Sequence, residues 1–275
     1  MRATFLSLAF FVLAALSAQA QSLPDSSALQ SLQTGNDARG WEAVGRLDVD
    51  GKGFCTGALI APDLVLTAAH CMYDKQSGRE IDLSRVEFMA GLRGGRPEAS
   101  RRLRNAVIHP SYIQSGAETT TSQVRFDVAL LQLDRPIRST NVQPFEVSTS
   151  MRRGTEVAVV SYAQDRADAP SLQEVCNILG LQDGVLIMDC DVNFGASGSP
   201  IFRMESGVPR LVSVVSAMGE LEGQKISLGM DLAEPIAILR LALEEGRGLF
   251  ATPPTSARII RPGERNDTGA LFVRP

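Results

Sequence analysis

The stretch Gly53–Cys71, GFCTGALIAPDLVLTAAHC, contains two apolar runs separated by a short turn signal. Phe54–Ile60 and Leu64–Thr67 have the length and composition of short strands, and the Pro-Asp pair between them favours a turn. The small-residue segment Thr67–Cys71 predicts one helical turn that carries His70. We therefore expect two short strands followed directly by a histidine.

The same pattern extends outward from this stretch, with short runs bounded by Gly, Pro, Asp, Asn or Ser. These runs are Ala43–Leu47, Val86–Ala90, Val128–Leu133, Glu156–Tyr162, Val175–Leu181, Val185–Met188, Leu211–Ala217 and Ile226–Met230. Many short strands at close spacing predict an all-β barrel or sandwich. Ala233–Glu245 differs, because its apolar positions are dense and a proline lies near its start, so we expect a closing helix. Residues 114–124 are polar and predict a surface loop.

The two ends of the chain differ in composition from the middle. Residues 1–20 combine a charged start, a short apolar run and an Ala-x-Ala site, which predicts a signal peptide cleaved after Ala20. Residues 21–40 are rich in Ser, Gln, Asp and Gly and predict a flexible leader or propeptide. Residues 247–275 predict a poorly packed tail. The folded domain is therefore expected over residues 41–246, in a protein that is secreted or periplasmic.

The composition excludes several classes of binding partner and cofactor. The net charge is −4 and no basic cluster is present, so nucleic acid is not an expected partner. No second apolar run approaches the length of a membrane-spanning helix, so the mature form is expected to lie outside membranes, as a monomer. With two histidines and no CxxC pair, we expect no metal site, and nothing demands an organic cofactor.

Four cysteines in an exported chain favour disulfide bonds. Four cysteines allow three connectivities. The simplest is local and joins Cys55 to Cys71 and Cys176 to Cys190. Closing a loop of about 15 residues would stabilise the fold by roughly 3 kcal/mol.

Three local contexts supply the groups that serine nucleophiles require. A serine needs a base within hydrogen-bond reach, the base needs a partner that fixes its tautomer, and the developing oxyanion needs backbone N–H donors. Ser197 lies in the glycine-containing turn GASGSP at 195–200, His70 ends TAAH, and Asp127 opens DVALL. We therefore expect Ser197 to be the nucleophile, His70 the general base and Asp127 the group that orients His70.

The strings TAAHC, DVALL and GxSGSP, in this order, resemble the chymotrypsin-type serine proteases over roughly residues 41–243. That resemblance implies two antiparallel β-barrels, about 41–147 and 148–246, with the active site in the cleft between them. It implies a secreted endopeptidase that acts on proteins or peptides. It also implies a Cys55–Cys71 disulfide, an oxyanion hole formed by the N–H groups of Gly195 and Ser197, and a Ser216 hydroxyl that supports Asp127.

The nucleophile motif departs from that of the animal enzymes in this family. Ala196 replaces the aspartate that pairs with a new N-terminus after activation, and Ser199 replaces a glycine. The Ile-Val-Gly-Gly start of the mature animal enzymes is also missing before Trp41. The Ser-Gly-Ser-Pro form is more similar to the bacterial branch that includes the glutamyl endopeptidases.

Specificity rests on fewer residues. Asp191 precedes Ser197 by six positions, the offset of the pocket-floor carboxylate in trypsin-like members, and would favour Arg or Lys before the scissile bond. A loop aspartate that caps a turn beside Cys190 is an equal alternative. Met218 could narrow the pocket entrance, and Val215 stands where glutamyl endopeptidases carry a histidine. The hypothesis is a preference for basic residues.

Three alternatives remain beside this interpretation. His109 is the other available base, but it precedes a proline in a turn-like context, so we interpret it as a surface histidine. A catalytically weak or inactive homologue would act as a secreted binding protein. An α/β-hydrolase esterase is disfavoured, because its Gly-x-Ser-x-Gly elbow is absent and its triad order is Ser, Asp, His.

Overall fold

The computed structural model describes residues 25–114, 119–148, 151–247 and 250–251 of the 275-residue chain. The predicted signal peptide and most of the predicted tail lie outside these residues. Strands dominate the described part, with two short α-helices and two 3-10 turns. Within it, no helix is long and apolar enough to cross a membrane.

The elements fall into two consecutive groups along the chain. The first group contains β1 (Gln30–Ser31), β2 (Val44–Val49), β3 (Gly53–Ala61), β4 (Leu64–Thr67), η1 (Ala69–Met72), η2 (Leu83–Arg85), β5 (Val86–Ala90), β6 (Ala99–Ile108), α1 (Thr121–Phe126) and β7 (Ala129–Leu133). The second contains β8 (Glu156–Ala163), β9 (Arg166–Gln182), β10 (Val185–Met188), β11 (Pro200–Glu205), β12 (Val208–Leu221), β13 (Gln224–Met230), α2 (Ala233–Glu244) and β14 (Phe250–Ala251).

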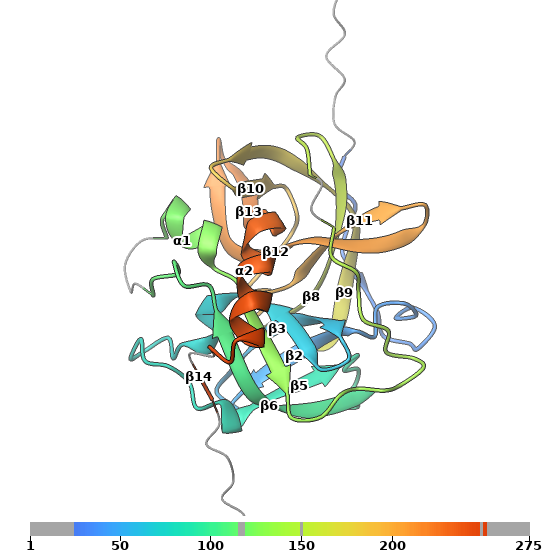
Figure 1. The fold of residues 1–275 in the computed structure, drawn as a ribbon. Coiled ribbons are helices and arrows are strands. Elements are labelled where there is room, and N and C mark those ends of the chain that lie inside the picture. Colours follow the sequence, from blue (N-terminus) through green and yellow to red (C-terminus); the bar gives the residue numbers. More distant parts are fainter. Residues whose placement is uncertain (1–24, 115–118, 149–150, 248–249, 252–275) are drawn as a thin grey trace, which may run out of the picture.

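Six strands of each group close into an antiparallel barrel, whereas β1 pairs with β9 of the second barrel and β14 pairs with β6 of the first. In the first barrel β2 pairs with β3, β3 with β4, β4 with β7, β7 with β6, β6 with β5 and β5 with β2. In the second barrel β8, β9, β10, β13, β12 and β11 pair in that order, and β11 pairs back with β8. Figure 1 shows the first barrel in the lower half and strands β10 to β13 of the second in the upper half. This confirms the predicted all-β, two-barrel fold.

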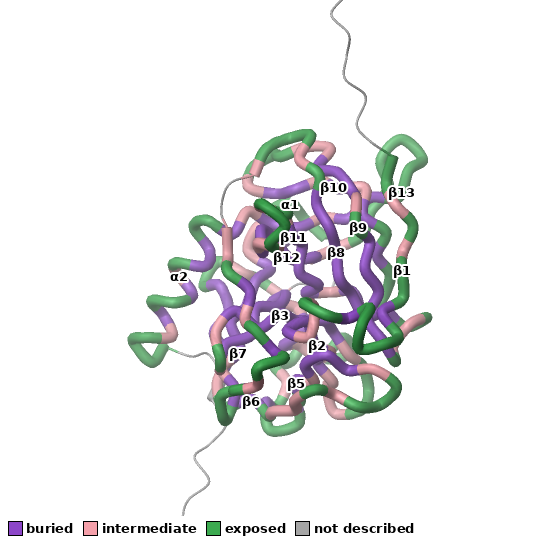
Figure 2. Tube along the Cα trace, turned by 90° about the vertical axis from the view of Figure 1, so that its right-hand side faces the viewer, coloured by how far each residue is buried: buried purple, intermediate pink, exposed green. Residues whose placement is uncertain are grey.

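The larger of the two apolar clusters includes residues of both barrels. Buried side chains of the first barrel, such as Leu47 and Leu66, belong to the same cluster as Tyr162 and Phe202 of the second. Figure 2 shows buried segments running through the strands and exposed segments gathered in the loops. Burial at roughly 25 cal/mol per Å² of apolar surface drives such packing. Ala196, the residue before Ser197, belongs instead to a second cluster inside the second barrel, together with Val192 and Val215.

Most predicted strands lie where their sequence patterns place them, but β6, β11 and the two-residue strands β1 and β14 were not predicted. Three arginines interrupt the apolar pattern of β6, and only its last residues form an apolar run. The strand β11 begins with a proline, and Arg203 and Glu205 interrupt its apolar residues. The closing helix is confirmed as α2, which contacts β6 and β7.

Residues 25–40, which the sequence predicted to be a flexible leader, are packed against the folded domain. The strand β1 pairs with β9, and Leu32 and Ala38 are each 1% exposed. The predicted surface loop at 114–124 also differs from the structure at its end, where α1 begins at Thr121. A capping box between Thr120 and Gln123 explains this helix, since it satisfies two N–H groups at the helix start.

Candidate active site

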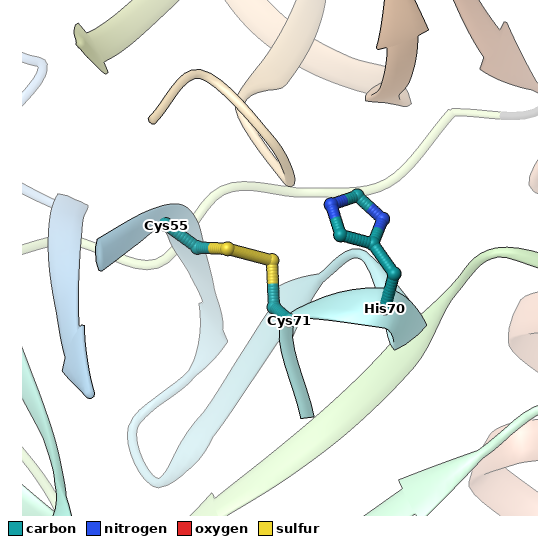
Figure 3. A group of neighbouring side chains, drawn as sticks. All are labelled: Cys55, His70 and Cys71. Carbon is teal, nitrogen blue, oxygen red and sulfur yellow. A yellow bond between two sulfur atoms is a disulfide. The ribbon is translucent and has the colours of Figure 1, made fainter. Parts of the chain in front are cut away.

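His70 lies in the 3-10 turn η1, directly after strand β4. The disulfide Cys55–Cys71 ties this turn to β3. Figure 3 shows the His70 ring beside this disulfide. Cys55, Cys71 and His70 have the spacing of a metal-binding group, but both sulfurs are consumed in the disulfide and offer no thiolate. The two cysteines therefore have a structural role beside His70.

Asp127 fixes the direction of the His70 ring. The carboxylate Oδ2 lies 2.6 Å from His70 Nδ1, and Oδ1 accepts the backbone N–H of His70 at 2.8 Å. Asp127 ends α1 and is 3% exposed. Because Nδ1 donates to the carboxylate, the neutral ring presents Nε2 as an acceptor, which is the tautomer that a general base needs.

Ser216 adds a third hydrogen bond to the same carboxylate. Its hydroxyl donates to Asp127 Oδ2 at 2.5 Å from strand β12 of the second barrel. Asp127 is thus held by donors from both barrels. The role predicted for Ser216 from the family resemblance matches this contact.

Two successive turns shape the segment that carries Ser197. The N–H of Ala196 donates to the Asn193 carbonyl, and the N–H of Ser199 donates to the Ala196 carbonyl, each at 2.9 Å. Gly195 and Gly198 occupy the third position of these turns with φ of +99° and +76°. Glycine adopts such angles without a steric penalty.

The neighbouring atoms also leave no room for a side chain at Gly195 or Gly198. A Cβ on Gly195 would lie 2.4 Å from the Phe54 ring, and a Cβ on Gly198 would lie 2.1 Å from Thr67 Oγ1. Thr56, also from β3, donates its N–H to the Ser197 carbonyl at 2.8 Å and its hydroxyl to the Gly195 carbonyl at 3.0 Å. The first barrel therefore holds the segment Gly195–Gly198 of the second.

The N–H groups of Gly195 and Ser197 donate to no acceptor within the described residues. The carbonyls of Gly195 and Ser197 accept hydrogen bonds from Thr56. The N–H groups of the same two residues therefore remain available to a substrate oxygen. No hydrogen bond joins His70 Nε2 to Ser197 Oγ in the described part of the chain. Such bonds are often long without substrate and shorten when it binds.

A cleft of about 430 Å³ brings these groups together at the junction of the barrels. His70, Asp127, Ser197, Ser216 and Met218 all line it. Its remaining lining comes from both barrels and consists of Lys75, Tyr112, Gln114, Thr119, Gln123, Val192, Asn193, Phe194, Val215 and Ala217. The structure therefore brings together most of the residues proposed from the sequence.

Asp191 is not among the residues that line the cleft. It is exposed, and its N–H donates to Gln173 Oε1 at 2.8 Å. Burial lowers the pKa of Arg166, and the nearby carboxylates of Asp165 and Asp191 oppose that shift. The Asp191 carboxylate therefore already lies near a cation of this chain, outside the cleft.

Sequence reasoning missed several residues of the site. Lys75 and Tyr112 line the cleft, and Thr56 holds the segment Gly195–Gly198, but none of them belongs to a short motif. The interpretation of His109 as a surface histidine is wrong, because it is 2% exposed. Its ring stacks on Phe126, a contact between distant parts of the sequence that a local turn pattern does not reveal.

The second disulfide joins Cys176 to Cys190 and ties β9 to the segment that leads to Val192 in the cleft wall. The structure thus has both local pairings among the three possible connectivities.

Comparisons with known proteins identify a matching family model and similar sequences. The family model described as Trypsin matches residues 33–233. Glutamyl endopeptidase of Bacillus licheniformis is 29% identical over 155 residues, which cover 56% of this chain and 46% of that protein. Trypsin of Saccharopolyspora erythraea is 31% identical over 101 residues, which cover 34% of this chain and 37% of that protein. Modular serine protease of Drosophila melanogaster is 37% identical over 94 residues, which cover 32% of this chain and 14% of that protein.

The chain thus spans less than half the length of the curated relatives it matches. Among solved structures, a Glu endopeptidase in complex with MPD superposes with a TM-score of 0.62 at 19% identity, covering 80% of this chain and 98% of that one. At this identity the superposition supports the fold alone.

Proposed function

Since this chain belongs to the trypsin family of chymotrypsin-like serine proteases, we propose that it is a serine endopeptidase with Ser197 as nucleophile. The observation that carries the proposal is a cleft lined by both Ser197 and a His70 ring that Asp127 fixes. Proteins or peptides are the proposed substrates. The resemblance to the bacterial branch is consistent with the match to glutamyl endopeptidase.

The proposed reaction proceeds in two halves. Ser197 Oγ attacks the scissile carbonyl carbon while His70 Nε2 takes the hydroxyl proton. The carbonyl oxygen becomes an oxyanion that accepts hydrogen bonds from the N–H groups of Gly195 and Ser197. His70 then gives its proton to the leaving amine, the C–N bond breaks, and the acyl group remains on Ser197. Water, deprotonated by His70, attacks the acyl-enzyme and releases the acid, with the proton returning to Ser197.

A fluorophosphonate probe tests the nucleophile directly. We expect the folded protein to be labelled, and both Ser197→Ala and His70→Ala to abolish labelling. Ser199→Ala is the matched control, since Ser199 lies two residues away and is fully buried. Absence of labelling in a folded wild-type protein would favour the alternative of a catalytically inactive binding protein.

The preference for Arg or Lys remains a prediction that depends on Asp191. Because Asp191 is exposed and Asp127 already accepts three hydrogen bonds, no described carboxylate is left in the cleft to pair with a basic side chain. Lys75 supplies a cation there, which would favour uncharged or acidic substrate residues. Peptides that differ only in Arg, Phe or Glu before the scissile bond test this. Fastest cleavage after Arg, lost in Asp191→Asn, would restore the basic preference.

We further propose export from the cytoplasm, with residues 1–20 as a cleaved signal peptide. Two disulfides support this, because such bonds persist in oxidising compartments. The remaining proposed boundaries are a protease domain over 41–246, with barrels at about 41–147 and 148–246, and a tail over 247–275. Fractionation of cells that express the full chain tests export.

A further inference from the structure

His109 is a buried histidine that the proposed reaction does not use. It directly follows strand β6 and is 2% exposed. Its Nδ1 accepts the backbone N–H of Ser111 at 3.2 Å, so the neutral ring carries its proton on Nε2. Nε2 is buried and has no hydrogen-bond partner among the described residues. The position of the ring is therefore set by one hydrogen bond and by packing.

The packing partner is the residue directly before Asp127. The rings of His109 and Phe126 are stacked, with centroids 4.7 Å apart and planes inclined by 14°. The backbone N–H of His109 donates to the carbonyl of Val128, the residue directly after Asp127, at 3.2 Å. His109 thus contacts the chain on both sides of the carboxylate that orients His70.

We propose that His109 is a positioning residue of the active site, which holds the segment Phe126–Val128 so that the Asp127 carboxylate meets the His70 ring. This inference rests on the proposed serine endopeptidase function, because it assigns His109 a role in that same site. A small displacement of such a carboxylate matters, since a misplacement of about 1 Å can cost on the order of a hundredfold in rate.

His109 also links the segment Phe126–Val128 to the wall of the cleft. The His109 backbone carbonyl accepts the N–H of Tyr112 at 2.9 Å, while the ring Nδ1 of His109 accepts the N–H of Ser111. These two bonds shape the turn that presents Tyr112, whose side chain lines the cleft. A phenylalanine at position 109 would keep the stack on Phe126 but would lose the Nδ1 acceptor.

The charge state of His109 is part of this arrangement. Burial lowers its pKa, Arg125 of α1 lowers it further, and Glu234 of α2 opposes the shift. Protonation would also place an Nδ1–H against the donor N–H of Ser111. The neutral ring is therefore the form that fits, and an acidic medium would disturb the stack.

Three variants separate positioning from general stability. His109→Leu removes the stack and the Nδ1 acceptor, His109→Phe keeps the stack, and Phe88→Leu removes a fully buried ring of the same barrel from strand β5. Measurements are kcat and KM on a peptide substrate, the pH profile of kcat/KM, thermal stability, and the low-field proton resonance of the His70–Asp127 hydrogen bond.

We expect His109→Leu to lower kcat about tenfold or more with little change in KM. The acidic limb of its kcat/KM profile, which follows protonation of the general base, should move to lower pH. The low-field resonance should shift or broaden. His109→Phe should recover most of kcat and of the resonance. Phe88→Leu should lose thermal stability while its kcat, acidic limb and resonance match the wild type.

Two results would overturn the inference: His109→Leu indistinguishable from wild type in kcat, acidic limb and resonance, or Phe88→Leu showing the same changes. A wild-type protein that neither hydrolyses peptides nor takes up the fluorophosphonate would instead overturn the proposed function. In that case the resonance, which requires no turnover, still decides whether His109 positions Asp127.

Discussion

At the scale of single residues, the Asp127 carboxylate accepts hydrogen bonds from both barrels, including those of His70, the proposed general base. Its two oxygens accept three hydrogen bonds, two from His70 and one from Ser216. Only the Ser216 bond comes from the second barrel. That bond therefore couples the relative position of the barrels to the direction of the His70 ring.

Ser216→Ala tests this coupling. We expect kcat to fall about ten- to a hundredfold, because a hydrogen bond to a charged group contributes roughly 1.5–3 kcal/mol. Ser213→Ala is the matched control, since its buried hydroxyl lies on the same strand β12 and donates to the Met230 carbonyl at 2.8 Å. Steady-state kinetics on both variants is the measurement. An equal loss of kcat in Ser213→Ala would show that the strand, and not the Asp127 contact, is responsible.

The buried His109 should make stability depend on pH. Its pKa is lowered from the ordinary value of 6.5, mainly by burial, so the folded state binds fewer protons than the unfolded state below that pH. The stability that neutral His109 contributes is therefore present above about pH 6.5 and is lost as the pH falls toward the folded-state pKa. We expect His109→Phe to lose less free energy of unfolding than wild type between about pH 7 and pH 5. Urea denaturation at both pH values measures this, and identical losses would contradict it.

At the scale of elements, the segment Gly195–Gly198 depends on glycines that have no room for a side chain. In Gly198→Ala the new Cβ would lie 2.1 Å from Thr67 Oγ1 and 2.4 Å from the Thr56 carbonyl, at a φ of +76°. Overpacking of this kind costs about 1–3 kcal/mol and would displace Ser197. We expect fluorophosphonate labelling to be lost. Gly207→Ala is matched in backbone, with φ +82° and nothing within 4 Å, and should label as wild type does. Labelling of Gly198→Ala at the wild-type rate would show that the segment tolerates displacement.

The two disulfides should affect stability similarly and activity differently. They close sequence separations of 16 and 14 residues, so each should stabilise the fold by about 3 kcal/mol. Replacing Cys55 and Cys71 by alanine frees the turn of His70 and should lower kcat. Replacing Cys176 and Cys190 frees the segment before Val192, which lines the cleft, and should raise KM. Urea denaturation and steady-state kinetics test both pairs, and a kcat loss confined to the second pair would contradict the assignment.

The elements that sequence reasoning recovered are those with local apolar patterns. β4 and β10 coincide with their predicted runs because their residues are nearly all apolar. The strand β6 escaped prediction because Arg101, Arg102 and Arg104 break its pattern, and pairing with β5 and β7 decides its structure. A local pattern does not contain such pairings.

At the scale of the whole molecule, the site depends on how the barrels fit together. The order of the three motifs indicated which residues would meet, through resemblance to a family and not through any distance along the chain. The same offset reasoning suggested a pocket-floor role for Asp191, which the structure leaves exposed outside the cleft. Contacts between barrels, such as Thr56 with the Gly195 carbonyl, carry no sequence signal of their own.

The segment of residues 25–40 extends the second barrel and should remain in the active protein. Gln30 and Ser31 pair with β9, the Ser27 hydroxyl accepts the Val175 N–H at 2.9 Å, and Leu32 is 1% exposed. We expect Leu32→Ala to lower the free energy of unfolding by about 2–5 kcal/mol, as deletion of a buried side chain does. Ile113→Ala, at a side chain 73% exposed, is the control and should change little. N-terminal sequencing of the active protein should give a start before Ser27. A start near Gly40 with full activity would show instead that this packed segment is a removable propeptide.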